Sequence, residues 1–120
     1  MNIVLREIKK RITSEDDIEN YLCRQIKILG GTAYKFTSPS KRAVPDRLCV
    51  LPRGLVIFIE VKRPKSTPTQ HQWKEINALR SKGHQATFVD SYERVDEVVQ
   101  QIKDKLETLP DIKEEVGFNV

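Results

Sequence analysis

The chain has 120 residues, of which 38% are apolar, so it is long enough for one folded domain and too short for two. No apolar run approaches the roughly 18 residues of a membrane span, and the first residues do not read as a signal peptide, so we expect a cytoplasmic, intracellular protein without membrane contact. Residues 31–90 hold eleven Lys and Arg against four Asp and Glu, whereas residues 91–120 hold four against eight. This basic middle segment favours a polyanionic partner, although a solvated lysine-rich surface has the same composition.

The amino-terminal part divides at the first helix-capping signal. Residues 1–13 carry apolar side chains at near-helical spacing with basic residues between them, which predicts a short helix or an arm outside the main domain. Ser14 is followed three residues later by Asp17, the spacing of a capping box, and acids suit the first turn of a helix. We therefore predict that the first helix of the domain begins at Thr13 or Ser14.

Glu19 is the acid of this helix without a capping role. It lies on the flank of the apolar stripe, beyond the reach of the helix dipole, so its carboxylate needs a positive partner. That partner is either a metal ion or a lysine such as Lys35 or Lys62. Gly30 and Gly31 then end the helix, since glycine adopts the left-handed conformation at a helix end without steric cost.

Residues 32–36 are predicted to form the first strand, and residues 37–42 form a polar, basic loop behind it. Loops of this composition, placed just before a functional strand, are suited to contact a phosphate backbone. An ordinary turn would have a similar composition.

The centre of the sequence predicts a hairpin, with strands at 46–51 and 55–61 around the turn Pro52-Arg53-Gly54. If Leu51 pairs with Leu55, the register places Asp46 opposite Glu60. Opposed side chains in an antiparallel pair have Cβ atoms about 4.5–5.5 Å apart, where two carboxylates repel each other unless a cation lies between them.

Lys62 follows Glu60 by two residues, so it points to the same face of the strand. A divalent cation such as Mg²⁺ takes one or two carboxylates together with water and phosphate oxygens. A lysine beside it can orient water or stabilise negative charge that develops on phosphorus. The alternative is that Asp46 and Glu60 are solvated strand-end charges and that Lys62 is a salt-bridge partner.

The second helix is predicted to begin with Thr67 as its N-cap, Pro68 at its first position and Gln70 as the reciprocal capping residue. Gln72 is then left without a capping role and shares one helix face with Ile76.

The rest of the chain predicts one more strand and one more helix. The strand covers residues 85–89, and the helix is capped by Asp90 and Ser91 and ends before Pro110. We place the domain at residues 14–106 and an acidic tail at residues 107–120.

The motif Pro45-Asp46, thirteen residues, then Glu60-Val61-Lys62 resembles the signature of PD-(D/E)XK nucleases. Further segments on either side extend the resemblance to the VRR-NUC branch of that superfamily, in its small stand-alone form from phages and bacteria. These segments are Gly30-Gly31, Tyr34-Lys35-Phe36, the helix containing Gln72, and Lys82-Gly83-His84. The resemblance covers residues 14–100.

The resemblance implies an α/β fold with a restriction-endonuclease-like core, in which a mixed four-stranded sheet is flanked by helices in the order α-β-β-β-α-β-α. It implies a set of catalytic residues: Asp46, Glu60, Lys62, Gln72 and Glu19. The implied ligands of Mg²⁺ or Mn²⁺ are Asp46, Glu60, the backbone carbonyl of Val61, and Glu19, with Glu15 as the alternative to Glu19. The polar and basic residues that we expect to contact DNA are Lys35, Ser38, Lys41, Arg42, Arg47, Arg63 and Lys65.

In function, the resemblance implies a Mg²⁺- or Mn²⁺-dependent DNA endonuclease that acts on branched DNA, in the manner of a Holliday-junction resolvase, as a symmetric homodimer. Two alternatives remain at this point. One is an enzyme that nicks DNA with little preference for structure. The other is a catalytically silent DNA-binding module with a nuclease fold.

Overall fold

The computed structural model describes residues 13–111, so the predictions for residues 1–12 and 112–120 lie outside the described residues. The first described helix, α2, covers Glu15–Ile28 and begins as its sequence predicts. Ser14 Oγ accepts a hydrogen bond from the Asp17 N–H at 3.1 Å, and Asp17 Oδ2 accepts one from the Ser14 N–H at 2.9 Å. The capping box therefore fixes where the helix starts.

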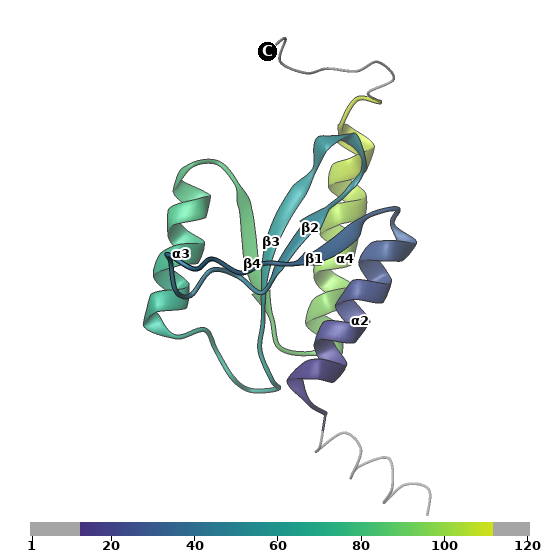
Figure 1. Cartoon of the computed structure of the whole chain (residues 1–120). Coiled ribbons are helices and arrows are strands. Elements are labelled where there is room, and N and C mark those ends of the chain that lie inside the picture. Colours follow the sequence, from purple (N-terminus) through teal and green to yellow (C-terminus); the bar gives the residue numbers. More distant parts are fainter. Residues whose placement is uncertain (1–12, 112–120) are drawn as a thin grey trace, which may run out of the picture.

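Four strands form one mixed sheet, as predicted, and they lie in the order β1-β2-β3-β4 (Figure 1). Strands β1 (Thr32–Lys35), β2 (Arg47–Val50) and β3 (Val56–Val61) are antiparallel, and β4 (Gln85–Val89) runs parallel to β3. The crossover from β3 to β4 contains a helix, as a parallel connection requires.

The hairpin between β2 and β3 has the predicted register. Val50 pairs with Val56 and Arg47 pairs with Ile59, so Asp46 and Glu60 lie one position beyond the last pair. The turn at Pro52–Gly54 is a short 3-10 segment, in which Arg53 adopts a left-handed conformation with φ of 62°. This short turn fixes the register and so fixes which carboxylates meet at the far end of the hairpin.

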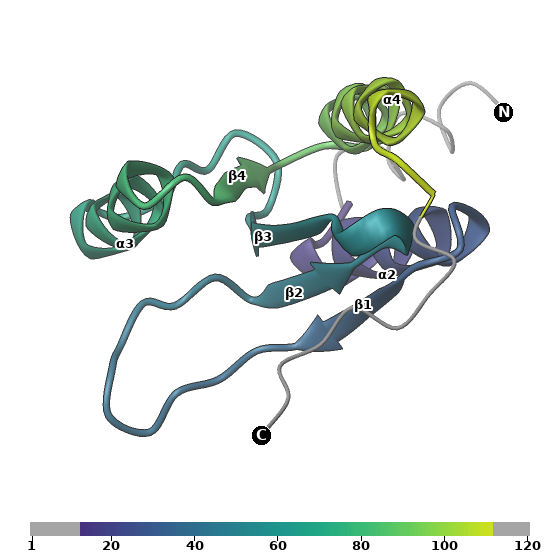
Figure 2. The ribbon, with the colours of Figure 1, turned by 90° about the horizontal axis from the view of Figure 1, so that it is seen from above.

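Helix α4 (Tyr92–Thr108) packs beside α2 on one face of the sheet, and α3 (Gln70–Ser81) packs against β4 on the other face (Figures 1 and 2). The core lies between the sheet and helices α2 and α4, where the buried side chains include Ile18, Ile59 and Val95. None of the helices in residues 13–111 has the length and apolarity needed to cross a membrane.

Two predictions about this framework need correction. The N-cap of α3 is Thr69 and not Thr67, and its reciprocal partner is Gln72 and not Gln70. Helix α4 ends at Thr108, before Pro110, as predicted.

Helices flank the sheet, as predicted, but they cover the two faces of the central strands unequally. On the α3 side, Val50 and Val56 remain 39% and 37% exposed, and Tyr34 on β1 is 55% exposed. Helix α3 lies over β4 and leaves this part of β1, β2 and β3 open within the described residues.

Candidate active site

Asp46 and Glu60 meet where β2 begins and β3 ends. The backbone N–H of Val61 donates a hydrogen bond to Asp46 Oδ2 at 2.8 Å, which holds the Asp46 side chain against β3. Glu60 is only 3% exposed, although most buried side chains around it are apolar. The fold therefore brings one carboxyl group into the protein interior beside a second one.

Burial raises the pKa of Glu60 to about 9, and the neighbouring Asp46 carboxylate adds to the rise. Lys62 lowers this pKa in part, and the charge of Glu15 raises it further. Within residues 13–111, Glu60 Oε2 is the one buried side-chain oxygen or nitrogen without a hydrogen-bond partner. A buried carboxyl oxygen that lacks a partner, next to a second carboxylate, is a place where a cation relieves both desolvation and repulsion.

The donor set fits a hard divalent cation. The described residues contain no group of three or more His, Cys, Asp or Glu side chains that could enclose a metal ion. A structural zinc site needs such a group, usually with sulfur or imidazole ligands. Mg²⁺ and Mn²⁺ accept two carboxylates and complete their coordination with water and phosphate oxygens.

Gln72 links the start of α3 to the end of β3. Its Oε1 accepts hydrogen bonds from the Thr69 N–H at 2.9 Å and from Lys62 Nζ at 3.1 Å. Its Nε2 donates to Glu60 Oε1 at 3.3 Å. One amide therefore caps α3, orients the ammonium group of Lys62 and contacts the buried carboxyl group.

Glu19 lies in an ion-pair network on the α2 side of the sheet. Arg47 Nε donates to Glu19 Oε2 at 3.0 Å, and Lys35 Nζ lies 3.5 Å from the same oxygen. The register explains this network, because Lys35 pairs with Arg47 across β1 and β2 and both point toward α2. Lys35 was an expected partner of Glu19, but the sequence did not reveal Arg47 as one.

Glu15 lies one helical turn before Glu19 on the same side of α2 and is exposed. Its charge acts on Glu60, whereas Glu19 is neutralised by two cations. Of the two helix acids, Glu15 is the one whose charge contributes to the raised pKa of Glu60, and Glu19 is the one that is paired with cations.

The residues expected to contact DNA differ in exposure and in their ion pairs within the protein. Arg47 has a side chain that is only 19% exposed and is bound to Glu19 and to the Ala33 carbonyl, which does not support a role in DNA contact. Lys41 is 60% exposed and forms an ion pair with Glu75 at 3.1 Å. Ser38 is half-buried, and the remaining four residues are exposed: Lys35, Arg42, Arg63 and Lys65.

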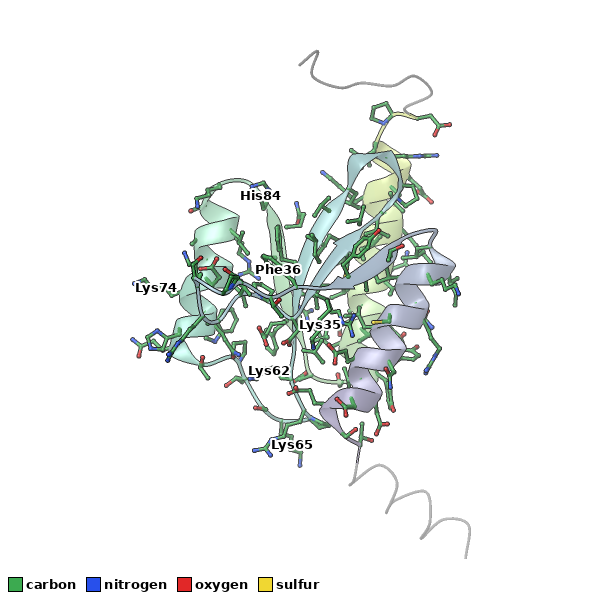
Figure 3. All side chains as sticks on the ribbon, in the orientation of Figure 1. Lys35, Phe36, Lys62, Lys65, Lys74 and His84 are labelled. Atoms are coloured by element: carbon green, nitrogen blue, oxygen red, sulfur yellow. The ribbon has the colours of Figure 1, made fainter. Side chains whose placement is uncertain are left out.

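Lys74 on α3 is a further exposed cation, which the sequence analysis did not select (Figure 3). Lys74 and Gln72 line the same cavity beside α3, but residues two apart on a helix do not face each other, so helical spacing gives no signal for Lys74.

Comparison with known proteins agrees with this fold. No family profile matches the chain. The chain is 47% identical over 81 residues to "Putative nuclease p44" of Acyrthosiphon pisum secondary endosymbiont phage 1, and the match covers 68% of this chain and 87% of the phage protein. A solved structure of a VRR_NUC domain superposes with a TM-score of 0.70 at 29% identity, covering 73% of this chain and 97% of that domain.

The mixed sheet, its flanking helices and these relatives define a nuclease with a PD-(D/E)XK-like fold. The chain belongs to the VRR-NUC family.

Proposed function

We propose that this nuclease is a Mg²⁺- or Mn²⁺-dependent endonuclease that hydrolyses phosphodiester bonds of DNA. The observation that carries the proposal is the buried Glu60 carboxyl group, whose Oε2 has no partner in the described structure and which lies beside Asp46. These two carboxylates would hold the ion, with the Val61 carbonyl as the expected backbone ligand. When bound, a divalent ion supplies positive charge that polarises the phosphodiester and acidifies water.

In this proposal, Lys62 is the cation that acts at the reacting phosphate. Its Nζ is held by Gln72 Oε1 at 3.1 Å, so the ammonium group is oriented before DNA binds. Such a group stabilises the negative charge that develops on the phosphoryl oxygens in the transition state, at little cost of reorganisation. Gln72 is then a positioning residue for Lys62 and for Glu60.

For the substrate, we propose branched DNA, and a four-way junction in particular. Exposed cations flank Asp46 and Glu60 in the sequence: Arg42 precedes Asp46, and Arg63 and Lys65 follow Glu60. These charges support binding to a phosphate backbone. A symmetric homodimer suits a substrate that needs paired incisions. The exposed apolar side chains of Tyr34 and Val50 on the open side of the sheet offer a surface for such a dimer.

The test is cleavage of an immobile four-way junction, a flap and a linear duplex at matched ionic strength, with Mg²⁺, Mn²⁺ or EDTA. We expect cleavage that requires metal and that is fastest on the junction. Equal nicking of all three DNAs would identify an enzyme with little structure preference. Binding without cleavage in either metal would identify a silent module and would contradict the proposal.

Substitutions of Glu19 and Glu15 on α2 are expected to differ in their effects on stability and on cleavage. Replacement Glu19→Gln leaves the Arg47 guanidinium half-buried without its carboxylate, so we expect a loss of about 1–3 kcal/mol in the free energy of unfolding. Replacement Glu15→Gln should leave stability nearly unchanged and slow metal-dependent cleavage, because Glu15 is exposed and its charge reaches Glu60.

Thermal melts and cleavage rates of both variants measure this difference, with Asp16→Asn in the same helical turn as the control. If Glu19→Gln melts like the wild type and yet loses cleavage, then Glu19 belongs to the metal site, as the sequence predicts.

A further inference from the structure

A cavity of about 660 Å³ lies between the loop that follows β1 and helix α3. The loop and α3 are on the same side of the sheet, and the loop extends well beyond the strands (Figure 2). Gln72 lines the cavity, and the same side chain contacts Lys62 and Glu60. A group bound in the cavity would therefore lie one side chain away from the proposed catalytic residues.

The lining of this cavity combines three kinds of chemistry. Arg42 and Lys74 are exposed cations that can bind a phosphate. Lys41 and Glu75 form an ion pair at 3.1 Å, which offers a donor and an acceptor side by side. Ala43 and Ala78 are small and apolar, so they can contact the flat face of a base.

The ion pair also joins the two walls. Lys41 belongs to the loop and Glu75 belongs to α3, where its side chain is only 14% exposed. Ala43 has φ of 66°, a left-handed conformation that is unfavourable for a residue with a Cβ. Such strain of the order of 1 kcal/mol persists where the surrounding structure holds it, and ligand clamps are among those places.

We propose that this cavity binds one unpaired nucleotide of the DNA, next to the phosphate that is cleaved. Its volume falls in the range of about 300–1,000 Å³ that is typical of small-ligand sites. A base inside a continuous duplex is stacked and cannot enter a cavity unless it is extruded, whereas a base that is already unpaired enters at the least cost. The inference rests on the proposed function and extends it, because base pairs at a branch point lack a continuous stack on one side and therefore open more readily than pairs inside a duplex.

The first test places 2-aminopurine either as a single unpaired base at a branch point or as a paired base within a continuous duplex, and measures its fluorescence and the affinity of each DNA in EDTA. For wild type, we expect a fluorescence change on binding of the branched DNA only. Replacement Ala78→Leu fills the cavity without changing its charge, so it should abolish that change and weaken binding of the branched DNA about tenfold. The control is Asn77→Leu, an exposed neighbour on the same helix, which should behave like wild type.

An unchanged fluorescence response in a folded Ala78→Leu variant would overturn the inference, and so would an equal loss of affinity for the continuous duplex. A second measurement does not depend on variants: deoxyadenosine monophosphate is titrated into the wild-type protein and amide NMR shifts are followed. Shifts centred on Ala43 and Ala78 support the site, and their absence contradicts it. Because neither test involves catalysis, an intact response without metal-dependent cleavage would contradict the proposed function alone.

Discussion

Lys62→Ala is expected to slow DNA cleavage at least about 100-fold while leaving DNA affinity within about twofold of wild type. The ammonium group is fixed by Gln72 beside Glu60, so its main contribution is made at the reacting phosphate. One charge among several exposed cations adds little to the counterion release that dominates affinity.

Single-turnover cleavage at saturating DNA and a separate binding titration in EDTA distinguish the two effects. The matched control is Lys65→Ala, which removes the same charge from an exposed position in the following turn. It should weaken binding and reduce its salt dependence, with little change in the cleavage rate at saturation. A parallel loss of binding and cleavage in Lys62→Ala would show that Lys62 is an ordinary phosphate contact.

Glu60→Gln is expected to stabilise the metal-free protein at pH 8. The folded-state pKa of Glu60 is about 9, above the ordinary value of 4.5, so the folded protein holds this proton more tightly than the unfolded chain does. The stability that the protonated group contributes is fully present below about pH 4.5 and is lost as the pH rises toward 9. A neutral amide does not titrate, so the variant should avoid this loss.

At pH 8 we expect the midpoint of thermal unfolding of Glu60→Gln to lie at least about 5 °C above that of wild type in EDTA, and the difference to shrink at pH 4. Mg²⁺ should reverse the order. At about one hundred times its dissociation constant, an ion that binds only the folded state stabilises wild type by about 2.7 kcal/mol, and the variant should gain much less.

Melts at both pH values, with EDTA or Mg²⁺ at constant ionic strength, provide the measurement, and Glu107→Gln, an exposed acid on α4, is the control. If Glu60→Gln is less stable than wild type in EDTA at pH 8, or gains as much stability from Mg²⁺ as wild type does, then Glu60 has a structural role and is not a metal ligand.

The part of the site that the sequence predicted well is the part that short-range geometry determines. A three-residue turn at Pro52–Gly54 sets the hairpin register, and the register alone brings Asp46 and Glu60 together. The capping box of α2 is equally local, because both partners lie within four residues.

The errors concern choices that depend on tertiary contacts. Thr67 and Thr69 are each followed three residues later by a glutamine, so either could start α3 by local rules. Thr69 is used, and in this arrangement Gln72 also reaches Lys62 and Glu60.

The position of Glu19 could not be predicted for a similar reason. Helical periodicity shows which face of α2 a residue occupies, but it does not show how far the helix lies along the sheet. Glu19 lies beside Lys35 and Arg47 and forms ion pairs with both. Glu15 lies one helical turn nearer the start of α2, and its charge contributes to the raised pKa of Glu60.

The central claim is that a divalent ion binds between Asp46 and Glu60, and anomalous diffraction from crystals containing Mn²⁺ tests it most directly. We predict an anomalous peak within coordination distance of the Asp46 carboxylate and of Glu60 Oε2, with Glu15 nearer to it than Glu19. The absence of a peak there at saturating Mn²⁺, or a peak held by other acids, would contradict the assignment of this carboxyl pair as the metal site.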